Sequence, residues 1–391
     1  MLPIIQMTFR PNFIELMWGQ PDPNLLAVDA MRRASANAFD RWGAQALHYG
    51  FFNGPGPLIE WLQARIQAHE RMAVSEHEIL ITGGNSLGFD QLLTLHTQPS
   101  DVVFVESPTY YIAINILRDH PNLTLMPVPA NENGILVEVL HERITQAKHA
   151  GKRPRLLYCV PTFNNPQGTS LSPERRLALV QLAAAEGLII VEDDVYRELN
   201  YDSDAPPSLW AIAKQHGIGH CVARLGSFAK SLAPGLRLGY MTAAPDLIAR
   251  IADGGVIFSG GGNNHMAAMQ VAAFCQNGDF DTNVAHLRNT YRARRDAMLR
   301  ALDTYLPHCR YIKPAGGYFV WVECPPYVDT SKLLSKAEAQ GMSYVPGTKF
   351  YTDGSGNNKL RLAFSLYEPA VLMEGVRRLG VALQYFLEDA Q

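Results

Sequence analysis

Short apolar runs alternate with longer amphipathic stretches along the middle of the chain. The apolar runs are rich in Val, Ile and Leu, which is typical of strands covered on both faces. Strands are expected at residues 78–82, 101–106, 156–160, 188–192, 221–225 and 238–242. Helices are expected at residues 86–97 and 172–186, the second opening with Ser and Pro as a helix start often does. This alternation predicts an α/β fold with a parallel or mostly parallel sheet between two layers of helices.

The pattern changes near residue 279. A long helix is expected at residues 281–305, followed by strands at 318–322 and 360–364 and a last helix from Pro369. These elements predict a second, smaller α+β domain. The expected division is an N-terminal arm with part of the small domain (1–44), a large domain (45–278) and a C-terminal small domain (279–391).

Composition and charge narrow the classes of protein. Apolar residues make up 47% of the 391 residues and charged residues 18%, as in a folded chain. With 34 Lys and Arg against 37 Asp and Glu, the net charge is −3, which argues against a nucleic-acid partner. No apolar run approaches the roughly 20 residues of a membrane span. The five cysteines are widely spaced and no metal-ligand spacing occurs, so we expect a cytoplasmic protein without a metal.

Polar and aromatic residues follow each predicted strand of the large domain. In an open α/β sheet, ligands bind beyond the carboxyl ends of the strands. These ends carry a lysine (Lys230), an acid (Asp193 or Asp194), amides, aromatic rings and a small-residue turn into a helix, with Arg237 close behind. A buried lysine forms a Schiff base with an aldehyde, a carboxylate can keep a ring nitrogen protonated, and a helix start suits a phosphate. The set predicts a site for a planar, phosphorylated, aldehyde-bearing heterocycle.

Four sequence blocks occur in the order and at the spacing of a known family. They are GSFAKSLAPGLRLGY (226–240), PTFNNPQG (161–168), EDDVY (192–196) and LRLAFS (360–365). The chain resembles the class I/II aminotransferases of the pyridoxal-phosphate fold-type I family, and most closely their 2-aminoadipate and aromatic aminotransferase-like subgroup. The resemblance implies an aspartate-aminotransferase-like fold, a three-layer large domain with a smaller α+β domain, and pyridoxal 5′-phosphate as cofactor.

The resemblance also implies a role for each matching residue. Lys230 would carry the internal aldimine and then move the proton between the substrate Cα and the cofactor. Asp193, three residues before Tyr196, would pair with the pyridine nitrogen. Tyr196 and Asn165 would bind the phenolic oxygen of the ring. Tyr110, rather than its neighbour Tyr111, would stack on the ring face.

The phosphate, the substrate and a second subunit are assigned in the same way. Phosphate-binding residues implied by the resemblance are Gly84, Asn85, Ser86, Ser227 and Arg237. Arg361 would clamp the substrate α-carboxylate, and Asn165 and Gly19 would line the substrate pocket. Tyr49 matches a tyrosine that reaches the phosphate of the neighbouring subunit, which implies a homodimer with shared active sites.

Three functions are compatible with these residues. The first is transamination, in which an amino acid gives its amine to the cofactor and a 2-oxo acid then takes it, by a ping-pong mechanism. The second is a lyase, or a carbon–carbon-bond-forming synthase or cyclase on the same fold, because Trp18 and Ala229 depart from the subgroup's pattern. The third, a sensor domain of a DNA-binding regulator, is disfavoured because the match begins near Gly19 and the net charge is −3.

The glycine-rich stretch 259–265 lacks the lysine of a nucleotide P-loop and is expected to be a flexible loop between subunits.

Overall fold

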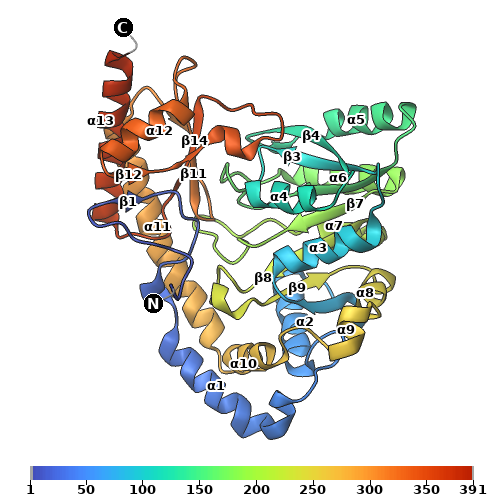
Figure 1. Ribbon diagram of the computed structural model, residues 1–391. Coiled ribbons are helices and arrows are strands. Elements are labelled where there is room, and N and C mark those ends of the chain that lie inside the picture. The colour runs from blue at the N-terminus through green and yellow to red at the C-terminus, as the bar shows by residue number, and fades with distance from the viewer. Residues whose placement is uncertain (1–2, 390–391) are drawn as a thin grey trace.

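The computed structural model describes residues 3–389, which form two packed units (Figure 1). The larger unit is built on an eight-stranded sheet with the order β2-β9-β8-β7-β6-β3-β4-β5. Its strands are β2 (Ile79–Thr82), β3 (Val102–Ser107), β4 (Thr124–Asn131), β5 (Gly134–Ile135), β6 (Pro154–Cys159), β7 (Ile189–Asp193), β8 (Val222–Ser227) and β9 (Gly239–Thr242). The six strands expected in this region are confirmed to within two residues at each end, and β4 and β5 are additional.

The sheet is mostly parallel, as the sequence predicts. Strands β4, β3, β6, β7 and β8 pair in parallel, whereas β9 runs antiparallel to both of its neighbours, β8 and β2. Strand β2 therefore points the same way as β8. The carboxyl ends of β2, β3, β6, β7 and β8 consequently lie along one edge of the sheet.

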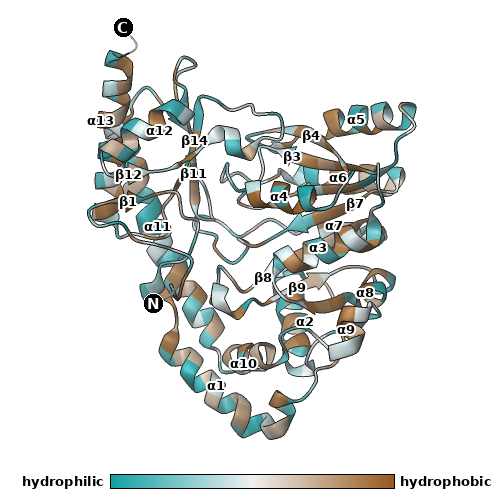
Figure 2. Cartoon of the chain, in the orientation of Figure 1, coloured by the Kyte–Doolittle hydropathy of each residue, from teal (hydrophilic) through white to brown (hydrophobic). Residues whose placement is uncertain are grey.

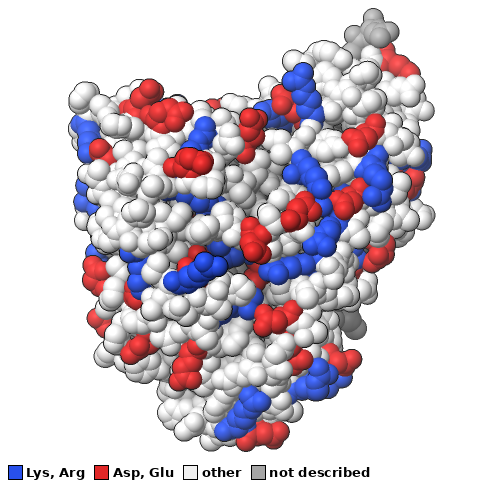
Figure 3. Space-filling model, turned by 180° about the vertical axis from the view of Figure 1, so that it is seen from behind, with Lys and Arg blue, Asp and Glu red and all other residues white. Residues whose placement is uncertain are grey.

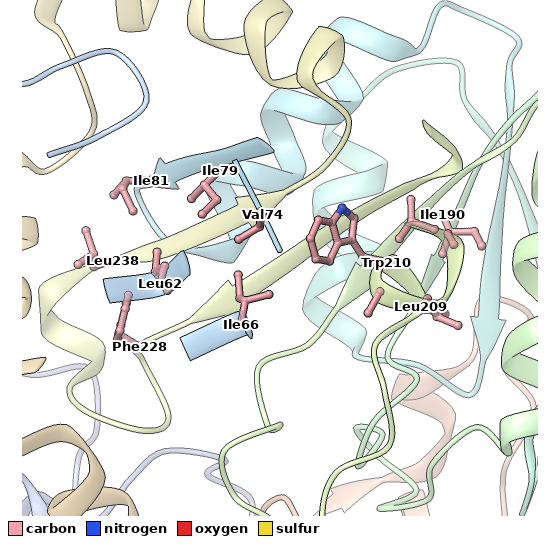
Figure 4. Close-up of a cluster of buried hydrophobic side chains, with 14 of the residues drawn as sticks. Leu62, Ile66, Val74, Ile79, Ile81, Ile190, Leu209, Trp210, Phe228 and Leu238 are labelled. Atoms are coloured by element: carbon pink, nitrogen blue, oxygen red, sulfur yellow. The ribbon is translucent and has the colours of Figure 1, made fainter. Parts of the chain in front are cut away.

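Helices cover both faces of this sheet because successive side chains of a strand point to opposite sides. One face packs against α3 (Asn85–His96), α4 (Tyr111–Asp119) and α8 (Pro245–Ala252). The other face packs against α2 (Gly56–Glu70), α5 (Val137–His149), α6 (Pro173–Glu186), α7 (Leu209–Gln215) and α10 (His265–Gln276). Figure 4 shows part of this second core, where Trp210 of α7 lies near Ile190 of β7. Figure 2 shows hydrophobic and hydrophilic residues mixed along these helices, and their buried hydrophobic residues form the cores against the sheet.

The smaller unit has its own sheet and core. The sheet has the order β10-β11-β14-β13, with antiparallel pairs throughout. Its strands are β10 (Arg310–Tyr311), β11 (Phe319–Glu323), β13 (Val345–Pro346) and β14 (Lys359–Ala363). The sheet packs with α11 (Asp279–Tyr305), α12 (Thr330–Ala339) and α13 (Pro369–Glu388) around a second hydrophobic core. The long helix, the two strands and the last helix expected after residue 279 are confirmed.

The first residues of the chain contact both units. Strand β1 (Ile14–Glu15) pairs in parallel with β12 (Met342–Ser343) of the smaller unit. Helix α1 (Val28–Trp42) packs against α10 of the larger unit, and short α9 (Gly255–Gly260) precedes α10. The domain limits at residues 44 and 278 stay predictions.

Candidate active site

A cavity of about 660 Å³ lies at the edge where the five strand ends meet. The smaller unit closes it from the side with Phe319 and Arg361, and the N-terminal segment contributes residues 17–21. The structure brings together twelve of the thirteen predicted site residues as lining: Gly19, Gly84, Asn85, Ser86, Tyr110, Asn165, Asp193, Tyr196, Ser227, Lys230, Arg237 and Arg361. Tyr49 is not part of this lining and is 77% exposed.

Lys230 lies in the loop that follows β8. Its ammonium Nζ donates a hydrogen bond of 2.8 Å to the carbonyl oxygen of Gly19, and its own carbonyl accepts from the Tyr318 hydroxyl at 3.1 Å. Burial lowers the pKa of Lys230 to about 8, and the nearby charge of Arg361 acts in the same direction. A substantial fraction of the amine is therefore neutral near pH 7.5, and the neutral amine is the nucleophilic form.

The two adjacent acids after β7 have different surroundings. Asp193 faces the cavity and accepts hydrogen bonds from Asn85 Nδ2 at 2.8 Å and Tyr158 Oη at 2.6 Å. Burial raises the pKa of Asp193, while these two hydrogen bonds oppose the rise. Asp194 instead forms ion pairs with Arg197 and Arg224 away from the cavity. Of the two acids, Asp193 is therefore the one placed to meet a ligand.

Tyr158 is a cavity residue that sequence reasoning missed. It lies within the apolar run of β6, where its ring is buried and packs against Phe89 of α3. Its neighbours in the sequence are apolar, so the local pattern predicts a core residue rather than a site residue. The contact with Asp193 depends on the parallel pairing of β6 with the adjacent strand β7, and this register could not be read from the sequence.

The part of the cavity lined by Gly84 and Arg237 is suited to an anion. Gly84 has φ of +91°, and a Cβ atom there would lie 2.9 Å from Nη2 of Arg237, so the turn lets the guanidinium approach the backbone closely. The turn leads into α3, whose first N–H groups have no partners within the helix. Ser86 and Ser227 line the same part of the wall. A guanidinium beside free N–H groups at a helix start fits a phosphate group.

Arg361 is buried in β14 and held on several sides. Nη1 donates to Asn165 Oδ1 at 2.9 Å, Nη2 donates to the Met17 carbonyl at 2.7 Å, and the guanidinium lies 4.0 Å from the centre of the Phe319 ring. Its Nε is buried without a hydrogen-bond partner. Burial lowers the pKa of Arg361 to about 10, so it remains a cation at neutral pH. A fixed cation with unused N–H groups can bind a carboxylate in a forked arrangement.

Three tyrosines complete the wall. Tyr110 lies directly before α4, and burial raises its pKa to about 12. Tyr111 also lines the cavity, but its ring packs edge-on against Phe350 of the smaller unit. Tyr196 is buried between the rings of Tyr318 and Phe319, and burial raises its pKa well above the usual range. Tyr110 and Tyr196 therefore keep their protons and can donate hydrogen bonds at neutral pH.

On the face of the molecule in Figure 3, Lys and Arg are interspersed with Asp and Glu, and neither charge forms a separate patch. Across residues 3–389, no helix has the length and apolar content needed to cross a membrane. The cavity, in contrast, brings Lys230, Asp193 and Arg361 together.

Comparisons with known proteins agree with this geometry. The family model of aminotransferase class I and II matches residues 18–379. An aromatic-amino-acid aminotransferase of Thermococcus litoralis is 30% identical over 97% of this chain and 90% of its own length. The solved α-aminoadipate aminotransferase of Thermus thermophilus, in complex with N-(5′-phosphopyridoxyl)-L-leucine, is 32% identical with a TM-score of 0.87, covering 97% of this chain and 94% of that chain.

A more distant structure confirms the expected architecture. The aspartate aminotransferase of Thermus thermophilus is 21% identical and has a TM-score of 0.79 over 95% of this chain and 91% of that chain, which shows a shared fold. The named relatives carry out transamination, so the lyase and synthase readings are not favoured. The chain belongs to the class I and II aminotransferases and is a transferase of amino groups.

Proposed function

We propose that the cavity binds pyridoxal 5′-phosphate and uses it to move an amino group from an L-amino acid to a 2-oxo acid. The observation that carries the proposal is the gathering of Lys230, Asp193 and Arg237 in one cavity with the start of α3. The family and the phosphopyridoxyl complex of a solved relative support the cofactor assignment. When bound, the cofactor supplies an aldehyde and a ring that can accept an electron pair.

The residues would hold the cofactor at its two ends. Lys230 would hold it covalently through Nζ, and Asp193 would keep a proton on the ring nitrogen. Ser86, Ser227 and Arg237 would bind the phosphate, together with the backbone of Gly84 and Asn85. Tyr110 would cover the ring face, and Tyr196 with Asn165 would donate hydrogen bonds to the ring oxygen. This arrangement would leave Lys230 free to move a proton once a substrate amine has displaced it.

The substrate would be oriented by its carboxylate. Arg361 would bind the α-carboxylate, and Asn165, which accepts from Arg361, would keep the guanidinium in place. Gly19 would form the part of the pocket wall beside Phe319. A Cβ atom at Gly19 would lie 2.5 Å from Cζ of Phe319, which leaves no room for a side chain. A fixed carboxylate leaves the substrate Cα within reach of Lys230, the group that moves its proton.

Absorbance and product analysis test this function. Purified protein loaded with pyridoxal 5′-phosphate is given one amino acid at a time, without a 2-oxo acid. We expect the visible band of the lysine-bound cofactor to bleach and one equivalent of 2-oxo acid to form per site. Lys230→Ala should show neither change, whereas Lys148→Ala, which removes an exposed lysine paired with Glu186, should behave like the wild type. Ammonia released catalytically, or initial-rate lines that intersect for the two substrates, would contradict the proposal.

We further propose a homodimer in which Tyr49 reaches the phosphate of the other subunit. Large apolar side chains are exposed next to Tyr49 in the sequence, at Leu47 and Phe51, and on α9, at Val256 and Phe258. Phe52 stacks on Phe258 at 5.5 Å between ring centres, so residues 47–52 and α9 form one apolar surface. An exposed apolar surface of this kind is typical of an interface.

A cytoplasmic location is also proposed, because all five cysteines are free thiols.

A further inference from the structure

Both carboxylate oxygens of Asp193 are held by side chains from other elements. Tyr158 in β6 donates its hydroxyl to Oδ2 at 2.6 Å, and Asn85 at the start of α3 donates Nδ2 to Oδ1 at 2.8 Å. Tyr158 is only 1% exposed, so its side chain is almost fully buried where it meets Asp193. The two donors bond different oxygens of the carboxylate and therefore restrict its rotation.

The orientation of the Asn85 amide is fixed by its second contact. Nδ2 also donates to the carbonyl oxygen of Leu225 at 2.9 Å, whereas Oδ1 is buried without a partner. If the amide were turned over, its oxygen would face two acceptor oxygens, the Asp193 carboxylate and the Leu225 carbonyl. That arrangement would be repulsive, so Nδ2 is the atom that faces Asp193.

We propose that Asn85 and Tyr158 are positioning residues that keep the Asp193 carboxylate ionised and directed into the cavity, toward the ring nitrogen of the cofactor. This inference rests on the proposed function, because it assigns the two residues an effect on the cofactor through Asp193. It also gives the side chain of Asn85 a role apart from the phosphate contact of its backbone.

The physical reason lies in the balance between burial and hydrogen bonding. Burial favours the neutral acid, which could not hold a proton on a ring nitrogen. Donors to a carboxylate favour the ionised form, and a hydrogen bond to a charged group is stronger than one between neutral groups. A carboxylate has about four acceptor positions, so the two donors leave positions for a protonated nitrogen.

Tyr158→Phe and Asn85→Ala separate this role from simple filling of space. The first readout is the dissociation constant of pyridoxal 5′-phosphate, measured by titrating the cofactor-free variants. The second is the pH midpoint of the visible band of the bound cofactor. We expect about 10-fold weaker cofactor binding for Tyr158→Phe, because this variant loses one charge-assisted hydrogen bond. The midpoint should rise, because a less firmly protonated ring makes the nitrogen that joins Lys230 to the cofactor more basic.

Steady-state kinetics provide a third readout. Because the two residues act on the cofactor rather than on the substrate carboxylate, kcat should fall while KM changes little. In an Asp193→Ala background, adding Tyr158→Phe should cause no further shift of the midpoint, since the group through which Tyr158 acts is gone.

Matched controls exist in the smaller unit. Tyr344 donates a buried hydroxyl hydrogen bond of 2.6 Å to the Thr330 carbonyl, and Asn358 donates Nδ2 to the Cys324 carbonyl at 2.7 Å. Tyr344→Phe and Asn358→Ala lose similar bonds and should leave cofactor affinity and the pH midpoint unchanged. If Tyr158→Phe does not fold, Asn85→Ala alone carries the test.

The outcomes separate this inference from the proposed function. Wild-type protein that binds no pyridoxal 5′-phosphate would overturn both. Wild-type protein that binds it, with both variants retaining wild-type affinity and midpoint, would overturn the positioning role and leave the proposed function intact. Weaker binding together with a raised midpoint, absent in the controls, is the result that the inference requires.

Discussion

Three consecutive acids, Glu192, Asp193 and Asp194, lie in three different surroundings. Glu192 accepts from the backbone N–H groups of Leu209 and Trp210 and so caps the start of α7, on one face of the sheet. Asp193 points to the opposite face, into the cavity. Asp194 leaves the strand and pairs with arginines. At the scale of single residues, function thus depends on strand alternation as much as on residue type.

A second buried acid, Glu106, predicts a pH dependence of stability. Its Oε2 accepts from the Val160 N–H and from Asn164 Nδ2, both at 2.9 Å, and burial raises its pKa to about 8. Between about pH 4.5 and 8 the unfolded chain has lost this proton and the folded chain retains it. The free energy of unfolding should therefore fall with rising pH in this window, by up to about 1.4 kcal/mol per pH unit from this group.

Glu106→Gln removes the titration but keeps an acceptor oxygen. Urea unfolding of the cofactor-free protein from pH 5 to 9 should show the stability of the wild type declining relative to Glu106→Gln up to about pH 8 and running parallel above it. Glu142→Gln, on the exposed side of α5, is the control and should track the wild type. Parallel curves for Glu106→Gln and wild type across the whole range would show that Glu106 is ionised in the folded protein.

At the scale of elements, the turn between β2 and α3 is the proposed phosphate site. Gly84→Ala would place a residue with a Cβ at φ of +91°, 2.9 Å from the Arg237 guanidinium. We expect at least about 10-fold weaker binding of pyridoxal 5′-phosphate, from backbone strain and displacement of Arg237. Gly219→Ala is the control, because its nearest neighbour atom would be at an ordinary 3.4 Å and its φ is not positive. Unchanged cofactor affinity in Gly84→Ala would rule out this turn as the phosphate site.

The buried parallel strands could be predicted from sequence because both of their faces are covered, so each appears as an uninterrupted apolar run. Strand β4 could not, since Pro127 and Pro129 interrupt it and prolines are unusual inside a sheet. The direction of β9 was equally hidden, because an apolar run does not record whether its neighbours are parallel. Family motifs supplied the candidate residues, but the contact of Tyr158 with Asp193 depends on the pairing of β6 with β7.

At the scale of the whole molecule, the cavity is assembled from parts that are distant in sequence. Gly19 of the N-terminal segment contacts Lys230 of the larger unit, and Asn165 of the larger unit binds Arg361 of the smaller one. Any movement of the smaller unit would therefore shift Arg361, the proposed carboxylate-binding residue, relative to Lys230. The sequence indicated two units, but only the fold shows that the site lies between them.

Mixed dimers test whether the site is shared between subunits. Tyr49→Ala and Lys230→Ala should each give low activity as homodimers. Co-expressed in equal amounts, they should recover about one quarter of the wild-type activity, since random pairing leaves one intact site in each mixed dimer and mixed dimers are half of the total. Activity equal to the average of the two parents would contradict a shared site, and mass measurement in solution would show whether mixed dimers had formed.

The most direct test of the account is to locate the covalent attachment of the cofactor. Protein loaded with pyridoxal 5′-phosphate is reduced with borohydride, digested and analysed by mass spectrometry. The account predicts one phosphopyridoxyl group per chain, on Lys230, and its disappearance when an amino acid substrate is added before reduction. A modification on another lysine, or none at all under conditions where an authentic aminotransferase is labelled, would contradict it.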